Sequence, residues 1–230
     1  MYKPFIAVII PAFNEEASIG KVISDIPRAF VQEIIVCDNG STDSTALKAT
    51  QSGASVVSEP RSGYGWACLK GMEYVDSWDR KPDIVVFLDG DYADYPDEIP
   101  DVVRPIVEEG YDMVIGSRPL GHPQPGSLTP PQIFGNWLAT SLIKLFYGYK
   151  FTDLGPFRAI KYDKLRELQM EDKTYGWTVE MQVKAARLGF TTTEVPVQYR
   201  PRIGQSKVSG TIKGTFLAGY KILWTIFKYL

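Results

Sequence analysis

Histidine and cysteine are nearly absent from this chain of 230 residues, which has one histidine and two cysteines. The histidine, His122, lies between Gly121 and Pro123 in a predicted loop. Neither a histidine-based catalytic triad nor a zinc site is therefore expected. Cys37 and Cys68 have no neighbour at metal-ligand spacing and lie in apolar surroundings. This pattern predicts two buried free thiols and a reducing compartment.

Excess basic charge and long apolar runs are missing as well. Lysine and arginine number 25 against 27 aspartate and glutamate residues, so no nucleic-acid partner is expected. No window holds about 18 uncharged apolar residues, which predicts no membrane-spanning helix. Residues 1–4 lead directly into an apolar run without a signal peptide, so we expect a cytoplasmic protein.

The first half of the chain alternates apolar runs with helical patterns. The apolar runs predict strands at 5–10, 33–37, 54–57, 83–88 and 112–115. Apolar residues at helical spacing predict helices at 15–26, 46–51, 66–77 and 96–108. This order predicts an α/β fold with a mostly parallel, twisted sheet flanked by helices. After a Pro- and Gly-rich loop at 121–131, the pattern predicts helices at 133–147 and 179–188, and a strand at 191–200.

Two carboxylates one residue apart, Asp89 and Asp91, end the apolar run that begins at Ile84. Burying a carboxylate costs several kcal/mol unless it is paired or bound to a metal. Hard cations such as Mg²⁺ take carboxylate oxygens together with substrate phosphates. The pair therefore indicates a divalent cation, with a solvated Asp-Gly turn as the alternative.

Two further polar clusters follow the first two predicted strands, and ligands of parallel sheets bind beyond these strand ends. Asn14 could cap the first helix, or it could face a ligand together with Glu15. Asp38 could accept an N–H group of a nucleobase, or it could form an Asx turn. A Gly-rich turn around Gly65 opens the helix at 66–77, and the N–H groups of a helix N-terminus favour phosphate.

Together these segments resemble the inverting glycosyltransferases of family 2, most closely the polyprenyl-phosphate sugar transferase group that includes dolichyl-phosphate mannose synthase. The resemblance covers about residues 8–220. Residues 11–15, Pro-Ala-Phe-Asn-Glu, resemble the opening motif of the family, and residues 38–43 resemble its Asp-Asp-Gly-Ser-Thr-Asp turn. Residues 89–91 match its D-x-D motif, residues 116–118 match a later turn, and residues 202–207 resemble its Arg-x-Gly-x-Ser-Lys motif.

The resemblance implies a nucleotide-diphospho-sugar transferase (GT-A) fold with a nucleoside-diphosphate sugar donor. It implies that Mg²⁺ or Mn²⁺ is held on the diphosphate by Asp89 and Asp91. Asp38 would contact the base, and the nucleoside pocket would include Pro11, Asn14 and Glu15. The phosphates of donor and acceptor would be gathered by Arg118, Arg202, Ser206 and Lys207, with Gly65 at the Gly-rich turn.

The chain departs from the family pattern in two places. Ala93 stands where relatives carry a Gln that assists the metal, and Asp94 is a candidate replacement. Residues 151–158 resemble an Asp-x-x-Ser-Gly-Phe-Arg region that would lie near the acceptor, with Gly155-Pro156 in place of its small polar pair. If the acceptor is a hydroxyl, Asp153 or Glu180 could be its general base. If it is a phosphate anion, positioning and charge neutralisation suffice.

The tail at 211–230 is apolar and aromatic, with a narrow stripe of polar or small residues at helical spacing. We interpret it as an amphipathic helix lying at a membrane surface. The alternatives are a helix docked on the core of the domain and a truncated membrane anchor. We thus expect a glycosyltransferase domain at 1–210, with a nucleotide-sugar half at 1–118 and an acceptor half at 119–210. The interfacial helix would bind the cytoplasmic face of a membrane.

The expected activity is inverting, metal-dependent sugar transfer to a polyprenyl phosphate, either dolichyl or undecaprenyl. One alternative is the same donor chemistry on a soluble saccharide or protein hydroxyl. Another is a sugar-1-phosphate nucleotidyltransferase, although residues 11–15 do not look like the Gly-rich loop that such enzymes need. A non-catalytic nucleotide-binding module is the remaining possibility.

Overall fold

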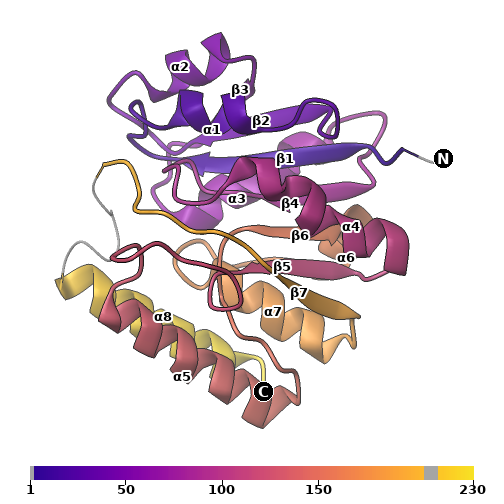
Figure 1. Ribbon diagram of the computed structural model, residues 1–230, viewed down its shortest axis with the longest axis vertical. Coiled ribbons are helices and arrows are strands. Elements are labelled where there is room, and N and C mark those ends of the chain that lie inside the picture. The colour runs from indigo at the N-terminus through magenta and orange to yellow at the C-terminus, as the bar shows by residue number, and fades with distance from the viewer. Residues whose placement is uncertain (1–2, 205–211) are drawn as a thin grey trace.

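One sheet of seven strands forms the centre of the molecule (Figure 1). The computed structural model describes residues 3–204 and 212–230, without the side chains of 212–216. The strand order is β3-β2-β1-β4-β6-β5-β7. Only β6 among these strands runs antiparallel to its neighbours β4 and β5. The strands are β1 (Ile6–Ala12), β2 (Glu33–Asp38), β3 (Ser55–Ser58), β4 (Ile84–Phe87), β5 (Met113–Ser117), β6 (Arg158–Lys161) and β7 (Thr192–Pro196).

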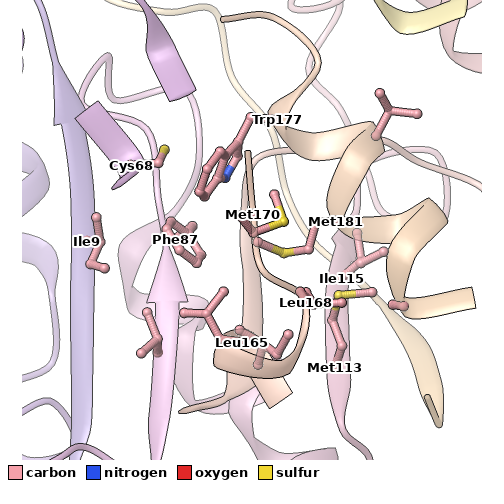
Figure 2. Packing of buried hydrophobic residues seen from close by; sticks show 14 of the residues in the cluster. Ile9, Cys68, Phe87, Met113, Ile115, Leu165, Leu168, Met170, Trp177 and Met181 are labelled. Atoms are coloured by element: carbon pink, nitrogen blue, oxygen red, sulfur yellow. The ribbon is translucent and has the colours of Figure 1, made fainter. Parts of the chain in front are cut away.

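Helices cover both faces of this sheet, because alternate residues of each central strand point to opposite sides. In β1, Ala7 and Ile9 pack into one apolar cluster, whereas Val8 and Ile10 pack into the other. Figure 2 shows part of the first cluster, where Phe87 of β4 meets Trp177. The helices are α1 (Ile19–Asp25), α2 (Thr45–Gln51), α3 (Tyr64–Asp76), α4 (Ile99–Glu109), α5 (Pro130–Tyr147), α6 (Tyr162–Glu167), α7 (Trp177–Arg187) and α8 (Ile212–Lys228).

The predicted fold class is confirmed, and the differences from the sequence analysis are local. The helix expected from residue 15 begins at Ile19, because Glu15 instead accepts the N–H groups of Ser18 and Ile19 in a turn. The predicted loop at 121–131 ends earlier than expected, because Thr129 caps α5 in a capping box with Gln132. Helix α6 and the antiparallel direction of β6 were not predicted.

The carboxyl ends of β1, β2, β4 and β5 lie at one edge of the sheet, because β1, β2 and β4 pair in parallel and both β4 and β5 run antiparallel to β6. In the register of the sheet, Ala12 pairs with Asp38 and Ile9 pairs with Phe87. The polar segments that follow these strands are thereby brought together. The later part of the chain adds β6 and β7, which lie on either side of β5 in the same sheet.

Helix α8 lies along α5 at the lower edge of Figure 1. The Tyr147 hydroxyl donates to the carbonyl of Ile226 at 2.5 Å, and Phe146 packs against Phe227 with 5.5 Å between ring centroids. Thr225 and Ile226 are buried, so the C-terminal part of α8 is docked on the domain. None of the helices in the described part of the chain is long and apolar enough to span a membrane.

Candidate active site

A cavity of about 690 Å³ opens at the carboxyl edge of the sheet and extends to α5 and α8. Concave sites at this edge are where ligands of such sheets bind. Six of the residues singled out in the sequence analysis line it: Pro11, Glu15, Asp89, Asp91, Arg118 and Arg202. They come from four separate segments, between 11 and 202 in the sequence.

The two carboxylates of the D-x-D motif lie in the wall of this cavity beyond β4. Asp89 accepts a hydrogen bond from the Tyr64 hydroxyl at 3.0 Å. Asp91 accepts the N–H of Ala93 at 2.9 Å, and its other oxygen pairs with Nη1 of Arg202 at 2.9 Å. Burial and the neighbouring charge of Asp91 raise the pKa of Asp89 to about 7. The pair therefore favours the presence of a cation.

Two carboxylates that face one cavity fit a hard divalent cation, which binds through one or two carboxylates together with substrate phosphates. No third ligand accompanies them, since no group of three acidic, histidine or cysteine side chains suited to a metal occurs in residues 3–204 or 217–230. Ala93 is buried and apolar. Asp94, the candidate replacement, does not line the cavity. It is only 3% exposed, and burial raises its pKa well above the usual range, which favours a protonated, neutral carboxyl.

Arg118 is held in place by Asp153. Nε and Nη2 of Arg118 donate to the two carboxylate oxygens at 2.7 and 2.6 Å, and its backbone N–H donates at 2.9 Å. Asp153 is fully buried, whereas Arg118 reaches the cavity. Such a fork of bonds fixes the plane of the guanidinium. In this arrangement Asp153 positions Arg118 and does not itself face the cavity.

Glu180, the second candidate base, points away from the cavity. Its oxygens accept hydrogen bonds from the backbone N–H groups of residues 171–172 and from the Tyr229 hydroxyl at 2.7 Å. The same carboxylate forms an ion pair with Lys184 at 2.9 Å. It is fully buried and is not among the residues that line the cavity. The two predicted general bases, Asp153 and Glu180, are thus both engaged by protein groups outside the cavity wall.

The nucleoside end of the site is built from the segments after β1 and β2. The side chain of Asn14 accepts the N–H of Thr42 at 2.8 Å and thereby ties these segments together. Asp38 accepts the N–H of Ser41 at 3.4 Å, the Asx-turn contact considered above. Asn39, which the sequence analysis did not single out, lines the cavity instead.

The Gly-rich turn is used for packing. A Cβ built on Gly65 would lie 2.0 Å from the carbonyl oxygen of Asp172, so only glycine fits there. The N–H of Trp66, in the first turn of α3, donates to the carbonyl of Lys173 at 3.2 Å. This contact occupies a group that we predicted would bind phosphate, and Gly65 does not line the cavity. Ser206 and Lys207 lie outside the described residues.

Several cavity residues carry no sequence signal of their own. Tyr64 would have been found only by knowing that the start of α3 lies close enough to Asp89 for the Tyr64 hydroxyl to reach it. Trp177 and Thr178 line the cavity from the first turn of α7. Helices α5 and α8 also contribute to the wall, through Pro131, Gln132, Gly135, Asn136, Ala218, Gly219 and Ile222.

The chain matches the model of the family described as glycosyl transferase family 2 over residues 7–169. It is 33% identical over 215 residues to an uncharacterised glycosyltransferase of Mycobacterium tuberculosis. The aligned region covers 93% of this chain and 94% of that protein. It is 31% identical over 208 residues to the dolichyl-phosphate hexose transferase of Haloferax volcanii, spanning 88% of this chain and 86% of that protein.

The fold also matches a solved structure. The crystal structure of glucosyl-3-phosphoglycerate synthase from Mycobacterium tuberculosis, in complex with Mn²⁺, uridine diphosphate and phosphoglyceric acid, superposes with a TM-score of 0.76. The two sequences are 26% identical, and the match covers 98% of this chain and 78% of that chain.

Proposed function

The chain belongs to glycosyl transferase family 2 and is a glycosyltransferase of GT-A fold, and from this premise we propose that it transfers a sugar from a nucleoside-diphosphate sugar to a polyprenyl phosphate. We propose that the reaction inverts the anomeric configuration and requires Mg²⁺ or Mn²⁺. The solved relative was crystallised with Mn²⁺ and uridine diphosphate. The Haloferax relative is named for transfer involving dolichyl phosphate.

The observation that carries the acceptor class is the lack of an available base. A hydroxyl acceptor must lose a proton during the reaction, which normally requires a positioned base. Among the described residues of the cavity wall, the acidic side chains are Glu15, Asp89 and Asp91, and none is histidine. Glu15 accepts a bond from Ser18 at the nucleoside end, and the other two are the proposed metal ligands. A phosphate acceptor is already an anion and needs no base.

The proposed step is an in-line displacement. An oxygen of the acceptor phosphate attacks the anomeric carbon, and the bond from that carbon to the diphosphate oxygen breaks. The nucleoside diphosphate leaves with the electron pair, and no proton is transferred if the acceptor is fully ionised. When bound, the cation would neutralise charge on the diphosphate. Asp89 and Asp91 would hold it there, while Arg118 and Arg202 would bind phosphate oxygens and orient the two substrates.

At the nucleoside end we propose that Pro11 and Glu15 line the pocket, that Asn14 shapes it from behind the wall, and that Asp38, next to the lining residue Asn39, contacts the base. The tie between Asn14 and Thr42 supports this, because it holds the two segments at a fixed separation. Roles for Ser206 and Lys207 at the phosphates remain predictions from the sequence motif.

We also propose peripheral contact with the cytoplasmic face of a membrane. Large apolar side chains on α5 and α8 are exposed to solvent, and both helices lie on one side of the molecule (Figure 1). Such patches mark docking surfaces, and aromatic residues favour the membrane boundary. The exposed residues are Ile133, Phe134, Trp137, Leu145, Phe146, Leu217, Tyr220, Trp224, Phe227 and Leu230.

A soluble acceptor is the second candidate. It is favoured by the similarity to glucosyl-3-phosphoglycerate synthase, which was crystallised with phosphoglyceric acid. In that case the exposed helices would contact another protein surface, and the acceptor would enter the cavity from water.

The test is a transfer assay with a panel of nucleoside-diphosphate sugars, with and without Mg²⁺ or Mn²⁺. A short polyprenyl phosphate, a soluble saccharide and phosphoglycerate serve as acceptors. We expect a metal-dependent lipid-linked sugar that Asp91→Asn abolishes and that Asp97→Asn, at an exposed position of the same segment, leaves unchanged. Glycosylation of a soluble acceptor, with no lipid product from any donor, would contradict the proposal.

A further inference from the structure

Tight packing surrounds Tyr64, the first residue of α3, on both sides. Gly63 has a φ of 146°, which a residue with a side chain rarely adopts. A Cβ built on Gly63 would lie 2.2 Å from the carbonyl oxygen of Lys173, and one built on Gly65 would lie 2.0 Å from that of Asp172. Two adjacent carbonyl groups thus contact the backbone before and after Tyr64.

A second set of contacts ties the same turn to the nucleoside end of the cavity. Asn39, which lines the cavity, accepts the N–H of Gly63 at 2.8 Å through its side-chain oxygen. The amide group of Asn39 donates to the carbonyls of Glu59 and Arg61 at 2.9 and 2.7 Å. These bonds hold the turn in one conformation, so Tyr64 begins α3 from a fixed position.

The side chain of Tyr64 lies in the cavity wall, and its hydroxyl donates to Oδ1 of Asp89 at 3.0 Å. A tyrosine hydroxyl keeps its proton near neutral pH, so it acts as the donor to the carboxylate. Oδ1 of Asp91 is held in a similar way, by the backbone N–H of Ala93 at 2.9 Å. Each carboxylate of the D-x-D motif thus has one oxygen that the protein itself holds.

The orientation of these carboxylates matters for a site with few ligands. No third acidic, histidine or cysteine ligand accompanies Asp89 and Asp91 within residues 3–204 or 217–230. A hydrogen bond to one oxygen of a carboxylate fixes its plane before a cation binds to the other oxygen. Loss of such a supporting bond typically lowers metal affinity by about 10- to 100-fold.

We propose that Tyr64 is a positioning residue for the metal site, and that its hydroxyl fixes the carboxylate of Asp89 so that the second oxygen faces the cation. The Gly-rich turn, which we expected to bind phosphate, serves instead to present this hydroxyl. Because Gly63 joins Tyr64 to Asn39, the same turn sets the spacing between the nucleoside end and the metal. This inference rests on the metal dependence of the proposed function.

The test removes one hydroxyl group. Tyr64→Phe should weaken the binding of Mn²⁺ alone to the nucleotide-free protein by about tenfold or more. The electron paramagnetic resonance signal of unbound Mn²⁺ measures this affinity. Tyr162→Phe is the matched control, because the Tyr162 hydroxyl donates to Asp76 at 2.7 Å and neither residue lines the cavity. Thermal unfolding should change to a similar extent in both variants, whereas only Tyr64→Phe should lose Mn²⁺ affinity.

Turnover and a spectroscopic signal give two further measurements. The Mn²⁺ concentration that supports half-maximal turnover should rise in Tyr64→Phe alone, while kcat at saturating Mn²⁺ should change little. In the unmodified protein with tyrosine labelled by ¹³C at Cζ, Mg²⁺ should shift the signal of Tyr64, because the cation withdraws charge from the carboxylate that accepts its hydrogen bond. The signal of Tyr162 should stay in place.

Mn²⁺ affinity in Tyr64→Phe that equals or exceeds that of Tyr162→Phe would overturn the role of Tyr64 and leave the metal site standing. A Tyr64 signal that Mg²⁺ does not move would count against the role in the same way. Failure of the unmodified protein to bind Mn²⁺, with or without uridine diphosphate, would overturn both this role and the metal dependence of the proposed function.

Discussion

At the scale of single residues, the protein itself neutralises most charges around the cavity. Asp153 forms an ion pair with Arg118. Glu180 forms an ion pair with Lys184 and accepts the backbone N–H of Asp172. Asp89 is different, because burial and the charge of Asp91 raise its pKa to about 7 and it accepts a hydrogen bond from the neutral hydroxyl of Tyr64. Arg202 is the cation that currently balances Asp91. The two D-x-D carboxylates are therefore the ones suited to receive a metal.

Arg202 and a metal ion compete for the same carboxylate oxygens of Asp91. We expect Arg202→Gln to increase the Mn²⁺ affinity of the nucleotide-free protein by about three- to tenfold, and to weaken nucleoside-diphosphate binding. Titration calorimetry measures both affinities. Arg104→Gln removes the same charge at an exposed position of α4 and serves as the control. Unchanged or weaker Mn²⁺ binding would show that Arg202 does not compete with the metal.

The raised pKa of Asp89 predicts a pH dependence of metal binding. A carboxyl must lose its proton to bind a cation, so protons compete with Mn²⁺ below the pKa of about 7. We expect the Mn²⁺ affinity to fall by up to about tenfold for each pH unit below 7 and to level off above it. Titrations between pH 5.5 and 8 measure this, and an affinity that is constant over this range would contradict the assignment.

At the scale of elements, local patterns predicted what depends on local sequence. The apolar run that ends in Asp89 and Asp91 identified both β4 and the carboxylates. Strand β6 was missed because it has four residues and begins at Arg158, a charged residue that is nonetheless fully buried. The cost of burying Arg158 is offset by hydrogen bonds that its guanidinium donates to backbone carbonyls, including that of Thr178. No sequence pattern reveals these bonds. Likewise, the helical pattern at 179–188 placed Glu180 on α7, but only tertiary packing determines that it faces residues 171–172.

The docking of the C-terminal helix α8 depends on polar contacts with two buried acidic residues, Asp172 and Glu180. The Tyr229 hydroxyl donates to buried Glu180 at 2.7 Å, and Lys221 pairs with Asp172 at 2.9 Å. We expect Tyr229→Phe to lower the free energy of unfolding by roughly 1–2 kcal/mol, because it removes a bond to a buried charge. Amide hydrogen exchange in α8 should increase. Tyr220→Phe, which alters a 67% exposed tyrosine within α8, should change neither quantity.

At the scale of the whole molecule, one cavity is lined both by the proposed metal-binding carboxylates and by the two helices that carry exposed apolar side chains. Pro11 and Asp89 come from the carboxyl edge of the sheet, and Gly135 and Gly219 come from the two helices. In Figure 1, α5 and α8 lie on the side of the molecule opposite α2. A surface that bound the membrane through α5 and α8 would bring the cavity opening to the lipid headgroups.

Membrane binding by this surface can be measured by co-sedimentation with anionic vesicles. We expect the double substitution Trp137→Ser and Trp224→Ser to reduce the bound fraction by about tenfold or more, since two exposed aromatic side chains no longer enter the interface. Leu47→Ser removes a side chain of α2 that is 59% exposed and should leave binding unchanged. Equal losses in both proteins, or no binding by the unmodified protein, would contradict the orientation.

The most direct test of the central claim offers the enzyme two acceptors with the same polyprenyl chain, one ending in phosphate and one in a hydroxyl. With the preferred donor and Mn²⁺, the account predicts product from the phosphate alone, because the site aligns anions and offers no base. The product should have the inverted anomeric configuration. Comparable transfer to the alcohol would contradict the account, since it would require a base that the described cavity wall does not provide.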